Sequence, residues 1–317
     1  MVDRVRLLSI AGSGRSGSTI LGRTLAQVRG WIYCGELRLG FFALAANRLC
    51  GCGMPAQECA FWRAVIEHAF GTFDRAVLER GAELSKRVAL NRHAALHLSP
   101  FRSSRFQSEV AEYAFIAAQI YRSMQAVSGA EVIIDTSKMP GYYLAMRENE
   151  SIDMYMVHLV RDSRAVAFSN RRKNLAPGNP NAVTFMPIQD PAVVAMAWNL
   201  KNAFVDMAMS TAGKSILLRY EDFIANPVRH VGAVIEMVGS KQRPPEIRDG
   251  TIEIGTDHSL AGNPIRFDRG VVHLRVDDEW RAAMQRRHQA LVTSLTWPML
   301  MAYGYLGRWR SEGAKSA

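Results

Sequence analysis

The sequence predicts an α/β fold in which a parallel β-sheet of about five strands is flanked by helices. The first observation is a set of five short apolar runs, each followed by sequence with helical periodicity. Near-continuous apolar runs are typical of strands in a parallel sheet that is covered on both faces. The second observation is a glycine-rich turn directly after the first run, which is where a doubly wound fold binds phosphate.

The five predicted strands are Val5–Ala11, Trp31–Cys34, Glu131–Asp135, Met154–Val160 and Ser215–Arg219. Right-handed crossovers would place the intervening helices on both faces of the sheet. The first of these helices is expected from Ile20 to Gln27, directly after the glycine-rich turn.

Helix boundaries can be read further along the chain. Asp190-Pro191 is expected to begin a helix that runs towards Gly213. Asn226 before Pro227 predicts an N-cap, and Gly239 predicts the end of the same helix.

A helical insertion is expected at roughly residues 60–130, because this stretch has helical periodicity and no strand pattern. It would cover one edge of the sheet. We find no internal repeat and no linker, so the sequence predicts a single domain over residues 1–317.

The charge balance favours an anionic partner. The 317 residues include 39 Lys and Arg against 29 Asp and Glu, which gives a net charge of +10. The arginines are spread along the chain and no nucleic-acid-binding motif is present, so we expect no nucleic acid. The apolar run before the turn is too short for a signal peptide or a membrane span, so we expect a cytoplasmic protein without a membrane-spanning helix.

All four cysteines lie early in the chain, at Cys34, Cys50, Cys52 and Cys59. The spacing of the last three lacks the paired C-x-x-C of common zinc sites. We therefore rank reduced structural thiols first, a disulfide second and a metal site last, and we expect no metal in the protein.

The turn carries the strongest signal for function. Gly12 and Gly17 have the spacing of a nucleotide-binding P-loop, but Ser18 stands where such a loop has lysine. A triphosphate site needs that lysine, so its loss argues against hydrolysis of ATP or GTP. Arg15 becomes the local cation instead. A P-loop kinase would also need an acidic ligand for Mg²⁺, for which Asp135 is the candidate.

A polar residue follows each predicted strand: Arg15, Glu36, Lys138, Arg161 and Tyr220. Because ligands of a parallel sheet bind beyond the carboxyl ends of its strands, these five side chains are expected at one edge. The set contains a carboxylate that could accept a proton and cations that could stabilise an anionic leaving group. Glu36 could instead cap a helix, and Lys138 could be a solvated loop lysine.

These residues resemble the motifs of sulfotransferases that use 3′-phosphoadenosine 5′-phosphosulfate (PAPS) as donor. The stretch Gly14-Arg15-Ser16-Gly17-Ser18-Thr19 is similar to the loop that binds the 5′-phosphosulfate, in a P-loop-like fold. The later Cys34-Gly35-Glu36 is similar to a segment of protein-tyrosine sulfotransferases, and Asp135-Thr-Ser-Lys138 to their lysine segment. The resemblance implies that Glu36 is the catalytic base and that Arg15 and Lys138 assist the leaving group.

The resemblance also assigns the 3′-phosphate and the C-terminal part of the site. Arg161 followed by Ser169 is similar to the segment that binds the 3′-phosphate, and Tyr220-Glu-Asp to a segment shared across the superfamily. A later stretch resembles the loop that closes over the donor, with His258, Ser259, Arg266, Arg269 and Gly270 as its candidates. Arg269-Gly270 lacks the neighbouring lysine found in cytosolic members. His258 is the rival base.

The cysteine segment Cys50-Gly-Cys52…Cys59-Ala-Phe-Trp62 also resembles one in bacterial sulfotransferases. The resemblance thus implies a PAPS-dependent sulfotransferase that transfers the sulfuryl group to a hydroxyl or phenol. The acceptor stays open among small molecules, glycans, lipids and peptides, with the helical insertion as the segment expected to recognise it. The alternatives are a P-loop small-molecule kinase and a non-catalytic protein that binds adenine nucleotides.

Overall fold

A computed structural model describes residues 4–172, 175–176, 184–185, 187–210 and 214–307. Its centre is a five-stranded sheet in the order β2-β3-β1-β4-β7, and all its paired strands run parallel. The strands are β1 (Val5–Gly12), β2 (Trp31–Gly35), β3 (Val132–Lys138), β4 (Ile152–Val160) and β7 (Ser215–Arg219). All five predicted strands are therefore present, and the predicted α/β fold with a parallel sheet is confirmed.

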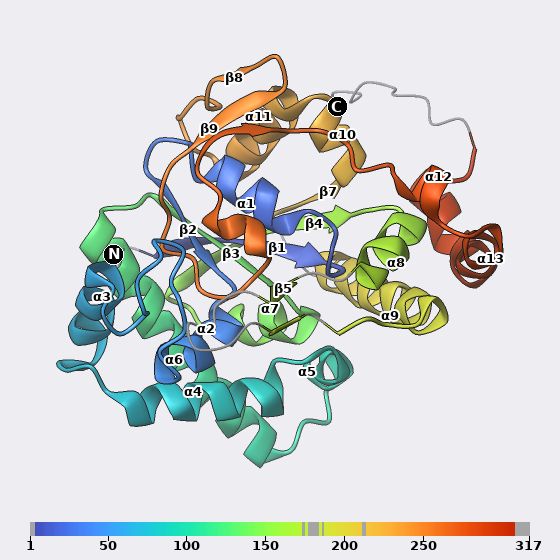
Figure 1. Cartoon of the computed structure of the whole chain (residues 1–317). Helices are drawn as coiled ribbons and strands as arrows, with labels where there is room; N and C mark the ends of the chain where they lie inside the picture. The colour runs from blue at the N-terminus through green and yellow to red at the C-terminus, as the bar shows by residue number, and fades with distance from the viewer. Residues whose placement is uncertain (1–3, 173–174, 177–183, 186, 211–213, 308–317) are drawn as a thin grey trace.

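The two faces of the sheet pack against different helices because successive residues of a strand point to opposite faces. Leu7 of β1 packs with side chains of helices on one face, and Leu8 packs with those on the other. The first set is α2 (Leu37–Ala45), α3 (Ala60–Phe70), α4 (Arg75–Val88), α6 (Ser104–Ser128) and α7 (Pro140–Met146). The second is α1 (Ser18–Leu25), α10 (Tyr220–Ala225) and α11 (Pro227–Val238). Figure 1 shows the two layers above and below the sheet.

The stretch from 60 to 130 is helical, as expected. Besides α3, α4 and α6 it contains η1 (Asn91–His93) and α5 (Ala94–Leu98). Trp62 of α3 and Tyr113 of α6 are fully buried in the core beneath the sheet. In Figure 1, α4, α5 and α6 lie below α2, and α3 lies at the left of the molecule.

A further group of helices packs at the end of β4, around Val160. It comprises α8 (Ser163–Arg171), α9 (Pro191–Ser210), α12 (Trp280–Ala283) and α13 (Arg286–Ala302), which pack around the buried Trp198. The predicted helix starts hold: α9 begins at Pro191, and Asn226 caps α11, which ends before Gly239. The predicted end of α9 near Gly213 lies outside the described residues.

The sequence did not predict the small antiparallel sheet on the α1 side. Its strands are β8 (Ile247–Arg248), β9 (Thr251–Ile254) and β10 (Gly270–His273). Residues 255–268, which include η2 (Pro264–Phe267), connect β9 to β10 and cross in front of α1 (Figure 1). We call residues 255–268 the covering segment. A two-stranded ribbon, β5 (Leu175–Ala176) with β6 (Thr184–Phe185), completes the described strands.

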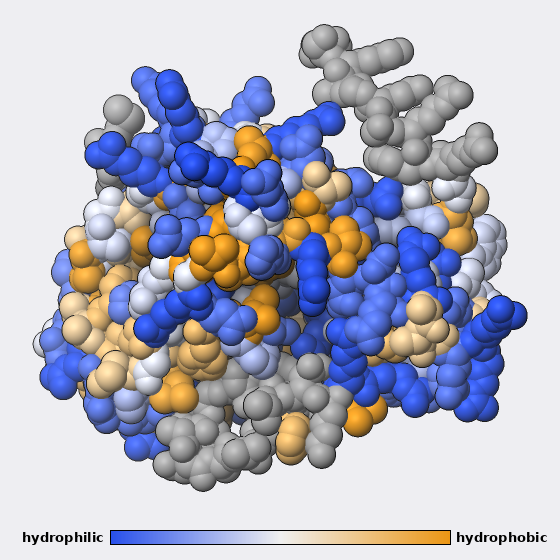
Figure 2. All heavy atoms as spheres, turned by 45° about the horizontal axis from the view of Figure 1, so that its top comes forward, coloured by the Kyte–Doolittle hydropathy of each residue, from blue (hydrophilic) through white to orange (hydrophobic). Residues whose placement is uncertain are grey.

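The face seen in Figure 2 is largely hydrophilic, with apolar side chains gathered near its centre. Within the described ranges, no helix combines the length and the apolar character that crossing a bilayer requires.

Candidate active site

The glycine-rich loop joins β1 to α1 at the carboxyl edge of the sheet. Gly17 is the N-cap of α1 and has a left-handed φ of 89°. A Cβ at this position would lie 2.4 Å from the Tyr220 ring, so only glycine fits between the loop and β7–α10. Arg15 also has a positive φ, 66°, a backbone conformation that side chains other than glycine rarely adopt. The loop thus brings backbone N–H groups and a guanidinium to one place.

The start of α2 explains how Glu36 becomes available for chemistry. Glu36 is the N-cap residue of α2, yet its side chain makes no capping hydrogen bond. The Leu37 N–H instead donates to Asp135 Oδ2 at 3.0 Å, and the Arg38 N–H donates to Ser137 Oγ at 3.1 Å. Because β3 provides the cap, the Glu36 carboxylate is free to pair with the Lys138 ammonium.

Asp135 is committed to this structural role. It is fully buried and also accepts a hydrogen bond of 2.7 Å from the Tyr121 hydroxyl. Burial raises the pKa of its carboxyl, while the hydrogen bonds from Ser137, Tyr121 and Leu37 oppose the shift. The candidate Mg²⁺ ligand of the kinase alternative therefore faces the core beneath α2.

Lys138 is placed by the register of the sheet. Its Cα pairs with Ala11, one residue before the glycine-rich loop begins at Gly12, after an irregularity in the β1–β3 ladder. Like Arg15 it has a left-handed backbone, with φ 61°. Two cations on uncommon backbone conformations thus lie on adjacent strand ends. Such conformations concentrate at functional sites, where the surrounding structure holds them in place.

These elements surround a cavity of about 350 Å³. Among the described residues, its lining contains four cations and a single carboxylate, Glu36. The net positive charge of this lining is therefore expected to attract and hold an anion. The polar part of the lining comprises Gly14, Arg15, Gly17, Ser18, Thr19, Glu36, Arg38, Ser137, Lys138, Asn170, Lys201, Gly262 and Asn263.

Sequence reasoning missed two of the four cations, Arg38 on α2 and Lys201 on α9. Both lie inside helices, so no strand end marks them. The pKa of Lys201 is lowered to about 8, chiefly by burial and also by the nearby Lys138, while Glu36 opposes the shift. Partial burial also lowers the pKa of the Arg15 guanidinium. Perturbed lysines in a cleft are candidates for function.

Arg161 lies beside the loop on the same rim. Its Nη1 donates to the Arg15 carbonyl oxygen at 3.0 Å, and its guanidinium stacks 4.7 Å from the centre of the Tyr220 ring. It also forms an ion pair of 3.2 Å with Asp277. The region around Tyr220 borders a second cavity of about 190 Å³ on the other side of α1, lined also by Ile20, Ile224 and Leu274. Arg161, predicted to bind the 3′-phosphate, is therefore hydrogen-bonded to Arg15 of the loop that is predicted to bind the phosphosulfate.

Helix α8 follows Arg161 directly, and Asp162 is its N-cap, accepting from the Arg164 N–H at 2.9 Å. Ser169 lies on this helix and is half-buried. The neighbouring Asn170, which was not predicted, lines the main cavity.

The covering segment closes the cavity from above. Leu260 pairs with Gly35, and its carbonyl oxygen accepts from the Glu36 N–H at 2.9 Å. Gly262 then lies against the site: a Cβ there would be 3.8 Å from Glu36 Oε1 and 3.7 Å from Thr19 Oγ1. The segment is fixed by the fully buried Arg23 of α1, which donates to Asp257 at 2.7 Å and to the carbonyl oxygens of Ile265 and Asp268 at 2.6 Å each.

The remaining candidates lie elsewhere. Arg266 donates to the carbonyl oxygens of Leu49 and Ser259, and Arg269 donates to that of Cys52. None of His258, Ser259, Arg266, Arg269 and Gly270 belongs to the described lining of the main cavity. The His258 ring stacks on Phe61, with 4.8 Å between centroids, and faces the cysteines. Their predicted roles in donor binding, and that of His258 as rival base, gain no support from this placement.

The fold and the site together define an α/β protein with an anion-binding loop at the carboxyl edge of its sheet. In a comparison with known protein families, the model of the sulfotransferase family matches residues 8–244 of the chain. The chain therefore belongs to the sulfotransferase family, as the motifs predicted.

One solved structure agrees with this fold. The sulfotransferase domain of the olefin synthase from Synechococcus PCC 7002 superposes with a TM-score of 0.53 at 17% identity, covering 94% of this chain and 96% of that one. A sulfotransferase from Alicyclobacillus acidocaldarius gives a TM-score of 0.42 at 12% identity, with 94% of each chain covered. No curated protein matches the chain.

Proposed function

We propose that the chain is a PAPS-dependent sulfotransferase in which Glu36 is the catalytic base and the acceptor is a hydroxyl or a phenol. The observation that carries the proposal is the Glu36–Lys138 ion pair in a cavity with a glycine-rich loop and three further cations. A base and a leaving-group cation side by side are what transfer of an anionic group between two oxygens requires.

The donor would be held by two sets of groups on one rim. The N–H groups at the start of α1 and the Arg15 guanidinium suit its phosphosulfate end. Arg161 and Tyr220, which contact each other and the loop, suit the nucleotide end, and Ser169 on α8 is the hydroxyl proposed for its 3′-phosphate. PAPS supplies an activated sulfuryl group and a nucleotide phosphate as leaving group.

Glu36 would accept the proton of the acceptor hydroxyl as that oxygen becomes a nucleophile. Because Asp135 and Ser137 cap α2, no helix N–H competes for the Glu36 carboxylate. Lys138 and Arg15 would place positive charge at the departing phosphate oxygen, each contributing about 10²–10³ in rate. Lys138 thus has two anionic partners, Glu36 before the reaction and the leaving group during it.

The acceptor would approach along α2. Leu39, which lines the cavity, and Phe42, three residues further on, are 37% and 50% exposed. Phe42 also borders a groove of about 270 Å³ between α2 and α4, where Arg75, Glu79 and Ala82 form the opposite side. The helical insertion supplies no described residue of the main cavity, so we propose that it recognises the distal part of the acceptor through this groove.

The test compares two nucleotides by thermal shift. 3′-Phosphoadenosine 5′-phosphate should raise the unfolding temperature of the chain more than ATP with Mg²⁺ at equal concentration, because the loop lacks the P-loop lysine. A larger shift with ATP and Mg²⁺ would refute the proposal in favour of a kinase.

A second measurement separates an enzyme from a binding protein. Conversion of PAPS to the bisphosphate, followed by chromatography with a panel of phenol, sugar and lipid acceptors, should depend on the acceptor. Binding of the bisphosphate without turnover on any acceptor class would indicate a non-catalytic nucleotide-binding protein.

A further inference from the structure

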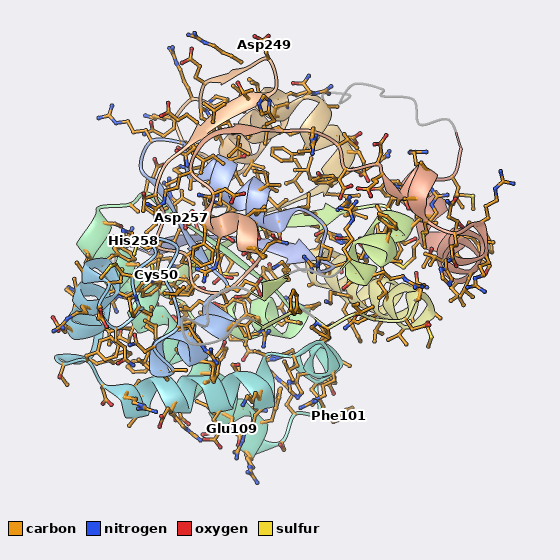
Figure 3. All side chains as sticks on the ribbon, viewed as in Figure 1. Cys50, Phe101, Glu109, Asp249, Asp257 and His258 are labelled. Carbon is orange, nitrogen blue, oxygen red and sulfur yellow. The ribbon has the colours of Figure 1, made fainter. Side chains whose placement is uncertain are left out.

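Three cysteines and a histidine meet at one point outside the active site. The thiol groups of Cys50, Cys52 and Cys59 and a ring nitrogen of His258 all lie within 4.8 Å of one another. Figure 3 shows Cys50 close to His258 and Asp257 of the covering segment, beside α3. Cys50 and Cys59 are buried and the other two are half-buried. We propose that these four residues bind a structural Zn²⁺ ion.

The distances between the ligand atoms fit a tetrahedral site. With Zn–S near about 2.3 Å and Zn–N near about 2.0–2.1 Å, two sulfurs lie about 3.8 Å apart and a sulfur and a nitrogen about 3.6 Å. The Sγ atoms of Cys52 and Cys59 are 3.7 Å apart. His258 Nδ1 is 3.8 Å from Cys50 Sγ and 3.3 Å from Cys59 Sγ. A disulfide would instead join two sulfurs at about 2.05 Å, and all four cysteines are free.

The loop that carries the cysteines is folded tightly around them. The Cys50 N–H donates to the Met54 carbonyl oxygen and the Gly53 N–H donates back to Cys50, both at 2.8 Å. A Cβ on Gly51 would lie 2.4 Å from Asp257 Oδ1, so the short Cys50-Gly51-Cys52 spacing lets the loop pack directly on the covering segment. The fourth ligand comes from that segment, 199 residues after Cys59.

The surroundings fix the histidine. The Phe61 ring stacks on the His258 imidazole at an interplanar angle of 18°. The Trp62 indole N–H donates to the His258 carbonyl oxygen at 2.7 Å. Both contacts hold the ring and the backbone of His258 in place, and residues around the ligands that orient them are a general feature of metal sites. The proposal thus explains the Cys59-Ala-Phe-Trp62 segment: Cys59 would be one ligand, and Phe61 and Trp62 hold His258, which would be another.

The charges also fit a zinc ion. Three thiolates, one neutral imidazole and Zn²⁺ carry a net charge of −1. Two arginines lie beside the cluster: Arg266 donates to Leu49 at 2.7 Å, and Arg269 donates to Cys52 at 2.7 Å. Their positive charge would offset the excess negative charge. This would give a role to Arg266 and Arg269, neither of which belongs to the described lining of the main cavity.

The ion would join two segments that shape the active site. One is the cysteine loop, which follows α2; helix α2 has Glu36 as its N-cap. The other is the covering segment, in which Leu260 pairs with Gly35, the neighbour of Glu36. Four protein ligands leave no open position, which is typical of a structural zinc site. Binding would displace the protons of the three thiols, so affinity should fall in acid. The proposal does not depend on the proposed sulfotransfer.

The test measures metal content directly. The chain, purified without chelators, should contain about one Zn²⁺ per molecule by elemental analysis. After removal of zinc and addition of CoCl₂, the chain should show the thiolate-to-cobalt charge-transfer band and the intense visible bands of tetrahedral cobalt. Because this measurement needs no variant, it stands even where a ligand variant fails to fold.

Variants identify the ligands. Cys52→Ser and His258→Asn should lose most of the bound metal, whereas Cys34→Ser, which changes a buried cysteine outside the cluster, should keep it. The proposal is overturned if chain reconstituted with ZnCl₂ or CoCl₂ holds well under half an equivalent. It is overturned equally if alkylation and mass spectrometry find a Cys52–Cys59 disulfide in the protein as isolated, or if Cys34→Ser loses metal as Cys52→Ser does.

Discussion

The pKa of Lys201 makes donor binding depend on pH in a predictable way. Lys201 lines the main cavity from α9, and burial lowers its pKa to about 8, with the positive charge of Lys138 acting in the same direction. A bound anion interacts with the ammonium form, so affinity for 3′-phosphoadenosine 5′-phosphate should be high below pH 8 and should fall as pH rises through that value.

The size of the effect follows from the protonated fraction. With a pKa of about 8, Lys201 is about nine-tenths protonated at pH 7 and about one-tenth protonated at pH 9. If the ammonium is needed for binding, the dissociation constant should therefore rise about tenfold between these two values, or about 1.4 kcal/mol. The ligand's own phosphates are already ionised above about pH 7, so they contribute little to this change.

Isothermal calorimetry at several pH values would measure the change, and two variants separate its cause. Lys201→Arg keeps a positive charge at every pH tested, so its affinity should be nearly constant from pH 7 to 9. Lys201→Met should bind weakly at all of them. A wild-type affinity that does not change, or an equal fall in Lys201→Arg, would refute the assignment of this titration to Lys201.

Three further outcomes are expected. Glu36→Gln should lower PAPS turnover by about 10²–10⁴ while affinity for the bisphosphate does not fall, because the change removes a base and a repelling charge; unchanged turnover would exclude Glu36 as the base. Gly17→Ala should lower the free energy of unfolding in chemical denaturation by about 1–3 kcal/mol or more, because the added Cβ would overlap the Tyr220 ring. Gly14→Ala is the control: its Cβ meets nothing within 4 Å, so it should cost less than about 0.5 kcal/mol. Equal losses in the two variants would contradict the loop geometry. Arg23→Met should cost about 3–5 kcal/mol because it leaves a carboxylate and carbonyl groups without their donor, and Arg63→Met, in an exposed pair, should cost under about 1 kcal/mol; a similar midpoint for both would argue against the role of Arg23.

The sequence was most informative about the strands and about the polar residues that directly follow them. Five apolar runs gave the five parallel strands, and the residue after each run gave Arg15, Glu36, Lys138, Arg161 and Tyr220 at one edge. Because parallel strands end at the same edge of a sheet, a position just after a strand predicts that a residue lies at that edge. The catalytic roles of these residues remain predictions.

The sequence was least informative where helices and distant segments converge. Arg38 and Lys201 lie inside helices, where one charged side chain looks like any solvent-facing one until the helix is oriented. The sequence places His258 in the stretch that resembles the closing loop, which makes it a candidate base. Its contact with Cys59 joins two segments that no spacing rule connects. Short β8, β9 and β10 carry too few residues to show a period of two.

The pairing of Leu260 with Gly35 has a consequence for how the enzyme matures. The glycine-rich loop, the proposed base Glu36 and Lys138 all precede residue 140 in the chain. The covering segment that closes the cavity follows more than a hundred residues later and lies beyond the 8–244 stretch that the family model matches. A nascent chain or a fragment that stops before residue 255 would hold the reactive groups in an open bowl exposed to water. Competence for transfer would then be acquired only when the last fifth of the polypeptide has folded over the rest.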